Sequence, residues 1–408
     1  MVEKNFLKMK ILRVIGSMDP SHGGPCQGIR NSIPALERLG IQNEVLSLDD
    51  PKAPFLAKDS FQIHALGPSR GPWGHSSNLI PWLDTNLNRF DIVIIHGLWQ
   101  YYSYATWKAV RRFKKMSQPS KVARLPKLFV MPHGMLDPYF QRAPDRKLKA
   151  IRNWIYWKLI ERKVINESDG ILFTCEAELL LAREPFQPYN PKLELNVGYG
   201  IEQPPPYDQA MSEAFFMKCN NLRGQPYVLF LSRIHEKKGV DLLIKAYAKT
   251  FGKDSPKLVV AGPGLESPYG QKLIKLISEN EEVNSSIFFP GMLSGDAKWG
   301  AFYGCDAFVL PSHQENFGIA VVEALACSKP VLISDQVNIW REIKAGGAGI
   351  VSSNTEKGVQ EMLENWGRLN NSEKLEMGKM ARSTFEELYA IGPAATRLLE
   401  TLQKIMSH

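Results

Sequence analysis

The chain contains 408 residues, of which 44% are hydrophobic, and this length predicts two globular domains rather than one. It has no apolar run of about eighteen residues and no signal peptide at its start, so a cytoplasmic protein is expected. The five cysteines form no C-x-x-C pair, which argues against a disulfide scaffold and a cysteine-rich zinc site.

The net charge of +8 comes from the first half of the chain, where residues 1–200 hold 28 Lys and Arg against 18 Asp and Glu. Much of this charge lies in residues 142–163, where tryptophan and tyrosine interleave with lysine and arginine. Such a stretch could rest on an anionic membrane surface or face an acidic acceptor. The alternative is a solvated helix with its aromatic side chains in the core. No motif that reads nucleic acid accompanies the charge, so no nucleic-acid partner is expected.

Short runs rich in Val, Ile, Leu and Phe recur through the first half, mostly separated by segments of helical length. They predict strands at residues 10–16, 43–48, 90–97, 126–134 and 170–175. Continuous apolar runs of this kind are typical of a parallel sheet that is covered on both faces.

The same pattern begins again after the proline run at residues 204–206. It predicts strands at 227–232, 257–262, 286–291, 307–312, 330–334 and 348–352. The expected fold is α/β, with two doubly wound, Rossmann-like domains at residues 1–205 and 206–385. A helical segment at 386–408 follows and could pack back on the first domain.

In open parallel sheets, ligands bind beyond the carboxyl ends of the strands. The first such loop, SMDPSHGGPCQG, contains Gly23 and Gly24, whose backbone amides could approach a phosphate. Asp49 ends the second strand where a ribose-binding acid would lie, but the dinucleotide fingerprint G-x-G-x-x-G is absent. NAD is therefore not the expected ligand.

A second loop, SRIHEKKG, places Arg233 and Lys238 between a buried strand and a helix expected to begin after Gly239. A guanidinium and an ammonium at a helix amino terminus suit a diphosphate, because both neutralise its oxygens. Taken alone, the loop could also be a solvated turn.

In a third loop, Glu315 and Glu323 lie eight positions apart around a helix start expected near Gly318. Both carboxylates could accept hydrogen bonds from the hydroxyls of one ligand, while the amides of Asn316, Phe317 and Gly318 could bind a sugar or a phosphate. A nucleotide sugar presents a ribose diol, a diphosphate and hexose hydroxyls together. Taken singly, helix capping and an exposed helical charge would explain the two glutamates.

Together these motifs resemble the retaining glycosyltransferases of the family-4 type, which have the two-domain GT-B architecture with a cleft between the domains. The resemblance rests on SRIHEKKG, AGPG, PGML and PSHQENFGIAVVEALACSKPVLIS, in family order and spacing, over most of residues 225–355. The first half matches more loosely, through GGPCQG and MPHGMLDPYF.

The family's residue roles fall on matching positions of this chain. The resemblance implies that Glu315 contacts the donor sugar and that Glu323 holds the ribose. It likewise assigns Arg233 and Lys238 to the diphosphate and His133 to the donor hexose.

The resemblance also assigns backbone contacts. The main chain near Leu293 would hold the base, and Gly23 and Gly24 would touch the phosphate side of the donor. Asn316 stands where many members have glycine. Because asparagine tolerates the left-handed conformation, the turn is expected to persist.

The implied reaction moves a hexose with retention from a nucleotide diphosphate sugar of the UDP-glucose type, in polysaccharide biosynthesis. The resemblance implies that a departing phosphate oxygen acts as the base. No D-x-D triplet or zinc-ligand spacing occurs, so neither a metal nor a cofactor is expected beside the nucleotide sugar. The alternatives are an inverting transferase with His133 as general base, a nucleotide-sugar epimerase and a noncatalytic nucleotide-binding protein.

The acceptor side is less defined. His96 and Trp99 lie at a strand end in HGLWQYYSYATWKAV, and aromatic faces pack on sugar rings. With His22 they could line an acceptor pocket, or they could begin a core helix in which His96 is structural. The basic stretch at 142–163 favours a glycan or lipid-linked acceptor, and with it a protein on the inner face of the membrane.

Overall fold

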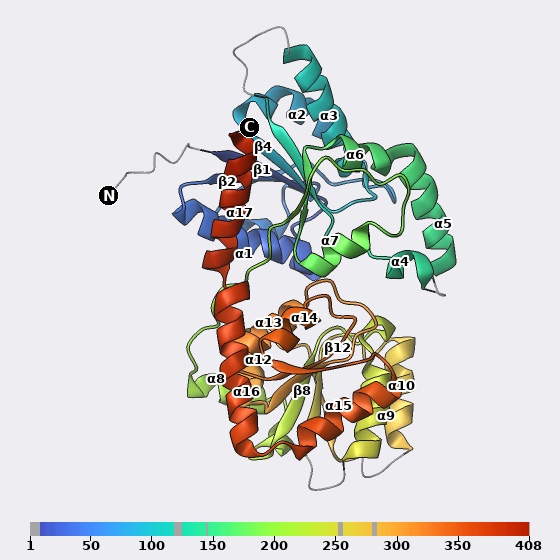
Figure 1. Ribbon diagram of the computed structural model, residues 1–408, viewed down its shortest axis with the longest axis vertical. Helices are drawn as coiled ribbons and strands as arrows, with labels where there is room; N and C mark the ends of the chain where they lie inside the picture. Colours follow the sequence, from blue (N-terminus) through green and yellow to red (C-terminus); the bar gives the residue numbers. More distant parts are fainter. Residues whose placement is uncertain (1–8, 118–124, 144–145, 252–255, 280–283, 408) are drawn as a thin grey trace. The chain divides into compact units, whose positions relative to one another are not determined.

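The computed structural model describes residues 9–117, 125–143, 146–251, 256–279 and 284–407. The chain divides into two compact units (Figure 1). The first comprises Met1–Gly200 and Ile391–His408, and the second comprises Ile201–Ala390. Within the described ranges, no helix has the length and apolar character needed to cross a membrane.

A parallel sheet forms the centre of the first unit and has seven strands among the described residues, in the order β3-β2-β1-β4-β5-β6-β7. The strands are β1 (Lys10–Ile15), β2 (Gln42–Ser47), β3 (Gln62–Ala65), β4 (Ile92–His96), β5 (Lys127–Met131), β6 (Gly170–Phe173) and β7 (Glu194–Asn196). The five strands predicted from apolar runs are confirmed. The two edge strands, β3 and β7, were not predicted.

Helices cover both faces of this sheet. The helices of this unit are α1 (Gly24–Arg38), α2 (Leu79–Asn86), α3 (Tyr101–Ser117), α4 (Tyr139–Arg142), α5 (Lys147–Tyr156), α6 (Arg162–Glu167), α7 (Glu176–Ala182) and α17 (Ile391–Met406), of which α4 and α5 add no residue to the core clusters at the sheet. Because successive strand residues point to opposite faces, Leu12 and Val14 pack against α2, α3 and α6, whereas Ile11 and Ile15 face the other side. Helices α1 and α17 cover that other side.

The second unit contains a parallel sheet of six strands in the part of the chain that is described, in the order β10-β9-β8-β11-β12-β13. The strands are β8 (Tyr227–Leu231), β9 (Lys257–Ala261), β10 (Ile287–Gly291), β11 (Ala307–Leu310), β12 (Val331–Ser334) and β13 (Gly349–Ser352). All six predicted strands of this half are confirmed.

The helices of the second unit lie on both sides of its sheet. They are α8 (Gln209–Phe216), α9 (Val240–Thr250), α10 (Pro268–Ser278), α12 (Gly295–Gly304), α13 (Ile319–Ala326), α14 (Trp340–Ala345), α15 (Glu356–Arg368) and α16 (Asn371–Thr384). In Figure 1, α9, α10 and α15 lie on one side of the sheet, and α8, α12, α13 and α16 lie on the other.

The two ends of the second unit meet. The amide of Ile201 donates to the Tyr389 carbonyl at 2.9 Å, and Ile201 forms a β-bridge with Ala390. The chain therefore leaves the first unit, completes the second, and returns to the first as α17.

Candidate functional site

The sheet of the second unit brings three predicted site residues together at its carboxyl edge. Strands β8 and β11 are neighbours, Arg233 and Lys238 follow β8, and Glu315 follows β11. The Nζ of Lys238 pairs with Oε2 of Glu315, and both side chains are largely buried. A cation from one loop thus meets a carboxylate from the neighbouring loop.

The loop that carries the two cations is held in place by close backbone approach. Gly239 has a φ of +66° and caps α9, and a Cβ at this position would lie 2.3 Å from the Pro311 carbonyl oxygen. A Cβ on Gly262 would lie 1.9 Å from the Ser232 carbonyl oxygen. These glycines let neighbouring strand-end loops pack directly against each other.

Glu315 is fixed through its backbone and kept ionised by its surroundings. Its amide donates to the Gln336 carbonyl and its own carbonyl accepts from Asn338, each at 2.9 Å. Burial alone would raise the pKa of Glu315, but the charges of Lys238, Lys237 and Arg233 bring this pKa below 4.5.

Arg233 is the exposed member of the group. Its guanidinium forms no hydrogen bond or ion pair with the residues that the structure describes, although its charge acts on Glu315. A fork of donors therefore remains available at this strand edge.

Glu323 has a lysine partner of its own. It lies in α13, and its Oε1 accepts from the Nζ of Lys298 in α12 at 2.9 Å. The two glutamates thus form two separate Lys–Glu pairs. Sequence reasoning missed Lys298, because only the packing of α12 beside α13 brings it near Glu323.

The turn before α13 differs in detail from the expectation. Gly318 takes the left-handed conformation, with a φ of +78°, and the helix begins at Ile319 as expected near this glycine. Asn316 does not have a positive φ, so the left-handed asparagine that was expected is not needed. Phe317 is buried and packs edge-on against Tyr389, which anchors the turn. Leu293, expected near the base, is buried just after β10.

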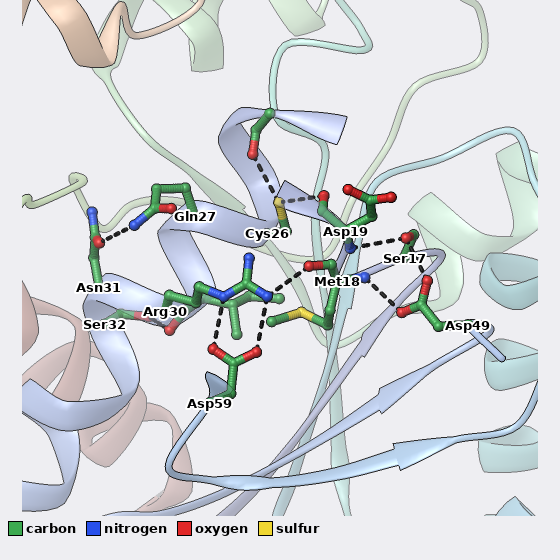
Figure 2. Close-up of polar contacts among 12 residues, drawn as sticks. Ser17, Met18, Asp19, Cys26, Gln27, Arg30, Asn31, Ser32, Asp49 and Asp59 are labelled. Carbon is green, nitrogen blue, oxygen red and sulfur yellow. Dashed lines mark hydrogen bonds and ion pairs between the residues drawn. The ribbon is translucent and has the colours of Figure 1, made fainter. Parts of the chain in front are cut away.

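In the first unit, half-buried polar side chains hold the glycine-rich loop in place through hydrogen bonds (Figure 2). The carboxylate of Asp49 accepts hydrogen bonds from the Ser17 hydroxyl and, at 2.8 Å, from the Met18 amide. Arg30 donates to both carboxylate oxygens of Asp59 and to the Met18 carbonyl. Asp49 therefore holds this loop in place. This structural role accounts for an acidic residue at the end of the strand without a ribose ligand.

Gly23 and Gly24 lie exposed at the amino terminus of α1. Gly23 has a φ of +88° and a ψ of −140°, a combination that is essentially restricted to glycine. A Cβ on Gly28, one turn further along α1, would lie 2.1 Å from the hydroxyl oxygen of Tyr199. That hydroxyl donates to the Gly24 carbonyl at 3.0 Å, so Tyr199 packs against the start of the helix.

His133 follows β5 in a strained turn. Its φ is +53°, which is uncommon for a residue other than glycine, and Gly134 follows with a φ of +78°. The buried carboxylate of Glu178 accepts from the Gly134 amide at 2.5 Å and from the Thr174 amide and hydroxyl. Glu178 thereby holds the backbone that carries His133. Sequence reasoning missed it, because its partner turn lies 44 residues away.

The ring of His133 contacts a second histidine. Its Nε2 lies 3.0 Å from Nδ1 of His96, and the two rings stack. His96 is 2% exposed, and its Nε2 lies 3.4 Å from Nη1 of the buried Arg13. Both ring nitrogens of His96 are therefore engaged within the protein. This geometry supports the structural alternative for His96 over an acceptor contact.

The other two residues considered for the acceptor lie apart from these contacts. His22 is exposed in the short turn before α1. Trp99 is half-buried and packs against Tyr156 and Phe186 at the margin of the apolar cluster around α3. Among the described residues, no group of three or more His, Cys, Asp or Glu side chains could hold a metal ion.

The basic stretch forms α5, a π-helical turn (Trp157–Glu161) and α6, while residues 144–145 lie outside the described part. One of its aromatic side chains, Trp157, is fully buried as the core alternative requires. Other large apolar side chains are instead exposed, at positions that follow helical spacing. They are Leu148, Ile151, Trp154, Ile155 and Leu159.

Two family models match the chain. "Glycosyl transferase 4-like domain" matches residues 23–195, and "Glycosyl transferases group 1" matches residues 212–382. The chain belongs to the group 1 glycosyltransferases. The family resemblance of the loops is thereby confirmed.

Similar curated proteins include other glycosyltransferases. Alpha-monoglucosyldiacylglycerol synthase of Streptococcus pneumoniae is 30% identical over 181 residues, which cover 43% of this chain and 39% of that protein. O-antigen chain mannosyltransferase C of Escherichia coli is 26% identical over 171 residues, covering 41% of this chain and 43% of that protein. The matched part thus spans less than half the length of these relatives.

Solved structures superpose over nearly the whole chain. Anabaena HepE in complex with UDP and glucose has a TM-score of 0.70 at 16% identity, covering 97% of this chain and all of HepE. WaaG, a glycosyltransferase involved in lipopolysaccharide biosynthesis, has a TM-score of 0.65 at 15% identity, covering 96% of this chain and 99% of WaaG. The expected GT-B fold is therefore confirmed.

Proposed function

We propose that this group 1 glycosyltransferase moves a hexose from a nucleotide diphosphate sugar, of the UDP-glucose type, to a glycan or lipid-linked acceptor with retention. The observation that carries the proposal is the group formed by Arg233, Lys238 and Glu315 at the edge of the second sheet. It combines an unpaired guanidinium, an ammonium and an ionised carboxylate at the strand ends where α/β proteins bind ligands.

In this proposal, the diphosphate binds Arg233 and replaces Glu315 as the ion-pair partner of Lys238. The carboxylate of Glu315 is then released to accept hydrogen bonds from hexose hydroxyls. Glu323 holds the ribose, and the main chain near Leu293 holds the base. The exchange of partners keeps Lys238 neutralised whether or not the donor is bound, which limits the cost of its burial.

The proposed chemistry needs no protein nucleophile. The bond from the anomeric carbon to the diphosphate oxygen breaks, and a bond to the acceptor oxygen forms on the same face. The acceptor proton passes to an oxygen of the departing diphosphate. Arg233 and Lys238 stabilise the negative charge that develops there, which is the largest electrostatic contribution.

The inverting alternative requires a histidine base. Burial, and in addition the charge of Arg13, lowers the pKa of His133 far below 6.5. A weakly basic imidazole is a poor general base near neutrality, so retention is favoured. The anomeric configuration of the product, determined by NMR, tests this choice, and an inverted product would refute it.

Donor binding can be tested by thermal unfolding with UDP, GDP and UDP-glucose. A ligand that binds the native state raises the midpoint, and we expect UDP and UDP-glucose to do so. Arg233→Ala should remove this shift, whereas substitution of the exposed Arg368 should not. Absence of a shift with every nucleotide would refute the proposed donor class. Conversion of UDP-glucose into an isomer without acceptor would instead favour an epimerase.

We further propose that α5 docks the protein on an anionic membrane, where a lipid-linked acceptor would lie. The exposed side chains of Leu148, Ile151 and Ile155 on α5 follow one another at spacings of three or four residues, so they share one helical face, and the exposed Leu159 follows four residues later in the π-helical turn. Exposed basic residues flank this face, and Lys158 lies 5.4 Å from the ring centre of the exposed Trp154. An apolar face with a basic border is typical of interfacial helices. The name of the Streptococcus pneumoniae relative, a glycolipid synthase, supports a lipid acceptor.

Co-sedimentation with phosphatidylglycerol vesicles tests this docking. The wild-type protein should sediment with these vesicles and much less with phosphatidylcholine alone. The double variant Leu148→Glu/Ile151→Glu should remain in solution. Leu375→Glu, which changes an exposed leucine on α16, should sediment like the wild type. Equal sedimentation of the wild type and the double variant would contradict the role of α5.

A further inference from the structure

A buried arginine interrupts the apolar face of the first sheet that α1 and α17 cover. Arg13 lies on β1 between Ile11 and Ile15, points to the same face as both, and is 2% exposed. Its Nε donates to Oδ1 of Asn43 at 3.1 Å, and its Nη2 has no hydrogen-bond partner. No carboxylate in the described residues pairs with it. Burying a guanidinium in this way is costly, which suggests a role beyond packing.

The contacts of Arg13 set a direction for hydrogen bonding through both histidines. A guanidinium can only donate, so Nε2 of His96 accepts from Nη1 at 3.4 Å. A neutral His96 must then carry its proton on Nδ1, which donates to Nε2 of His133 at 3.0 Å. His133 in turn must carry its proton on Nδ1.

Both imidazoles are neutral, as this assignment requires. Burial is the main reason that the pKa of His96 and of His133 lies well below 6.5, and the charge of Arg13 lowers both further. Burial also lowers the pKa of Arg13 to about 10, so the guanidinium still carries its charge at neutral pH. A charged guanidinium therefore contacts the first of two neutral imidazole rings that are hydrogen-bonded in series.

From this chain of contacts, we infer that Arg13 is a positioning residue that fixes His133 as a hydrogen-bond donor through Nδ1–H. In this state His133 cannot take a proton, because Nε2 already accepts from His96 and Nδ1 is already protonated. Arg13 sets the tautomer of the ring, while Glu178 sets the strained backbone of the same residue. Two buried charged side chains thus fix one imidazole.

Which ligand oxygen accepts the hydrogen bond from Nδ1–H of His133 depends on the proposed function. If the donor is a nucleotide sugar, the Nδ1–H of His133 donates to an oxygen of its hexose, and Arg13 strengthens this bond through the chain. A nucleoside diphosphate without the hexose does not use the bond. Loss of Arg13 should therefore weaken binding of the sugar nucleotide and leave binding of the free diphosphate unchanged.

The tautomers can be measured without any ligand. In the full-length protein labelled with ¹⁵N-histidine, two-bond ¹H–¹⁵N correlation spectra distinguish Nδ1–H from Nε2–H rings. His96→Asn and His133→Asn variants assign the two signals. We expect both rings to be Nδ1–H and to show no titration between about pH 5 and 8. An Nε2–H form of either ring, or titration in this range, would overturn the inference.

Substitutions at Arg13 test its control over the tautomer. Arg13→Met removes the donor and should give mixed tautomers at both histidines, whereas Arg13→Lys keeps a cationic donor and should restore Nδ1–H. Ile11→Val, two residues away on the same face, should leave the spectrum unchanged and reports the effect of altered packing alone. If Arg13→Met folds and keeps both rings as Nδ1–H, Arg13 does not position them. If Arg13→Met does not fold, the wild-type spectrum still tests the inference, because an Nε2–H form of either ring would overturn it.

Titration calorimetry with UDP and UDP-glucose completes the test. For Arg13→Met we expect about tenfold weaker binding of UDP-glucose and unchanged binding of UDP, as suits the loss of one hydrogen bond. Equal weakening of both ligands would show a general structural effect and contradict the inference. Failure of the wild type to bind either ligand would refute the proposed donor, while the tautomer spectra would still test the role of Arg13.

Discussion

Lys238 forms an ion pair with Glu315 in the structure. In the proposed reaction, it pairs with the diphosphate of the donor instead. Removing the ammonium leaves the developing negative charge with one fewer strong donor. We expect Lys238→Ala to reduce transition-state stabilisation by on the order of 2 to 4 kcal/mol, measured as kcat with donor and acceptor.

Lys249→Ala is the matched control for this change. Lys249 also pairs with a glutamate, Glu356, but both side chains are more exposed, and the pair lies at the other end of α9. Its loss should change kcat little, because exposed ion pairs contribute little. A Lys238→Ala enzyme as active as the Lys249→Ala enzyme would contradict the assigned role.

Glu161 is a buried acid that the proposed reaction does not use. It is fully buried, its Oε1 accepts from the Trp99 amide and the Ser103 hydroxyl, and its Oε2 has no partner. Burial raises the pKa of Glu161 from 4.5 to about 7, only partly offset by these two hydrogen bonds. The native state therefore binds this proton more tightly than the unfolded state.

This shift predicts a loss of stability as the pH rises. The stabilising proton is fully present below pH 4.5 and is lost through about pH 7, so the native state is weakened at pH 8. Glu161→Gln keeps an acceptor without ionising. It should exceed the wild type in unfolding free energy at pH 8 by about 2 to 3 kcal/mol, with a much smaller difference at pH 5. Denaturant unfolding at both pH values measures this, and a difference independent of pH would contradict it.

At the scale of the element, the turn at Gly239 joins the cation loop to α9. A side chain there meets both a left-handed φ and the Pro311 carbonyl. We expect Gly239→Ala to lower the unfolding free energy by at least about 2 kcal/mol and to reduce activity, because Lys238 is the preceding residue. Thermal unfolding and initial rates measure the two effects.

Gly224→Ala separates the two causes. Gly224 has a φ of +77°, but nothing lies within 4 Å of an added Cβ. This variant therefore carries only the backbone strain, about 1 to 2 kcal/mol, and should keep its activity. Equal stability and activity of the two variants would show that the contact with Pro311 is unimportant.

The elements that the sequence predicted are those with continuous apolar runs. All central strands of both sheets have such runs, because helices cover them on both faces. The edge strands β3 (QIHA) and β7 (ELN) are short and less buried, so periodicity does not reveal them. Helix starts at Val240 and Ile319 could be predicted because a glycine precedes each.

Within the candidate site, the residues that lie in the loop motifs could be predicted. Their partners outside the motifs could not. Arg233, Lys238 and Glu315 lie in loops whose strands become neighbours in the sheet. Lys298 carries no local pattern that marks it. Arg13 was missed although it is a lone charged residue inside an apolar strand run, which is a local signal of a buried charge.

At the scale of the molecule, α17 completes the first unit although it follows the second in the sequence. Leu398, Leu399 and Leu402 pack with Ile11 and Ile92 in one buried cluster. We expect Leu402→Ala to destabilise the first unit by about 2 to 5 kcal/mol, through lost burial and the cavity left behind. Hydrogen exchange should become faster in β1 and β4 and remain unchanged in β8.

Leu375→Ala is the control for this truncation, because Leu375 is 65% exposed on α16. It should leave the exchange of both units close to that of the wild type. Faster exchange in β8 of the Leu402→Ala protein would show that the two units do not respond separately.

The return of the chain at Ala390 has a consequence for biosynthesis. A ribosome releases all of Ile201–Ala390, whose own ends meet, before the residues of α17 emerge. The second unit of the nascent protein can therefore fold before the first unit is complete. Until then, the apolar surface around Ile11 and Ile92 in the first unit stays uncovered. Helix α17, which is translated after the whole of Ile201–Ala390, is the helix that completes the first unit.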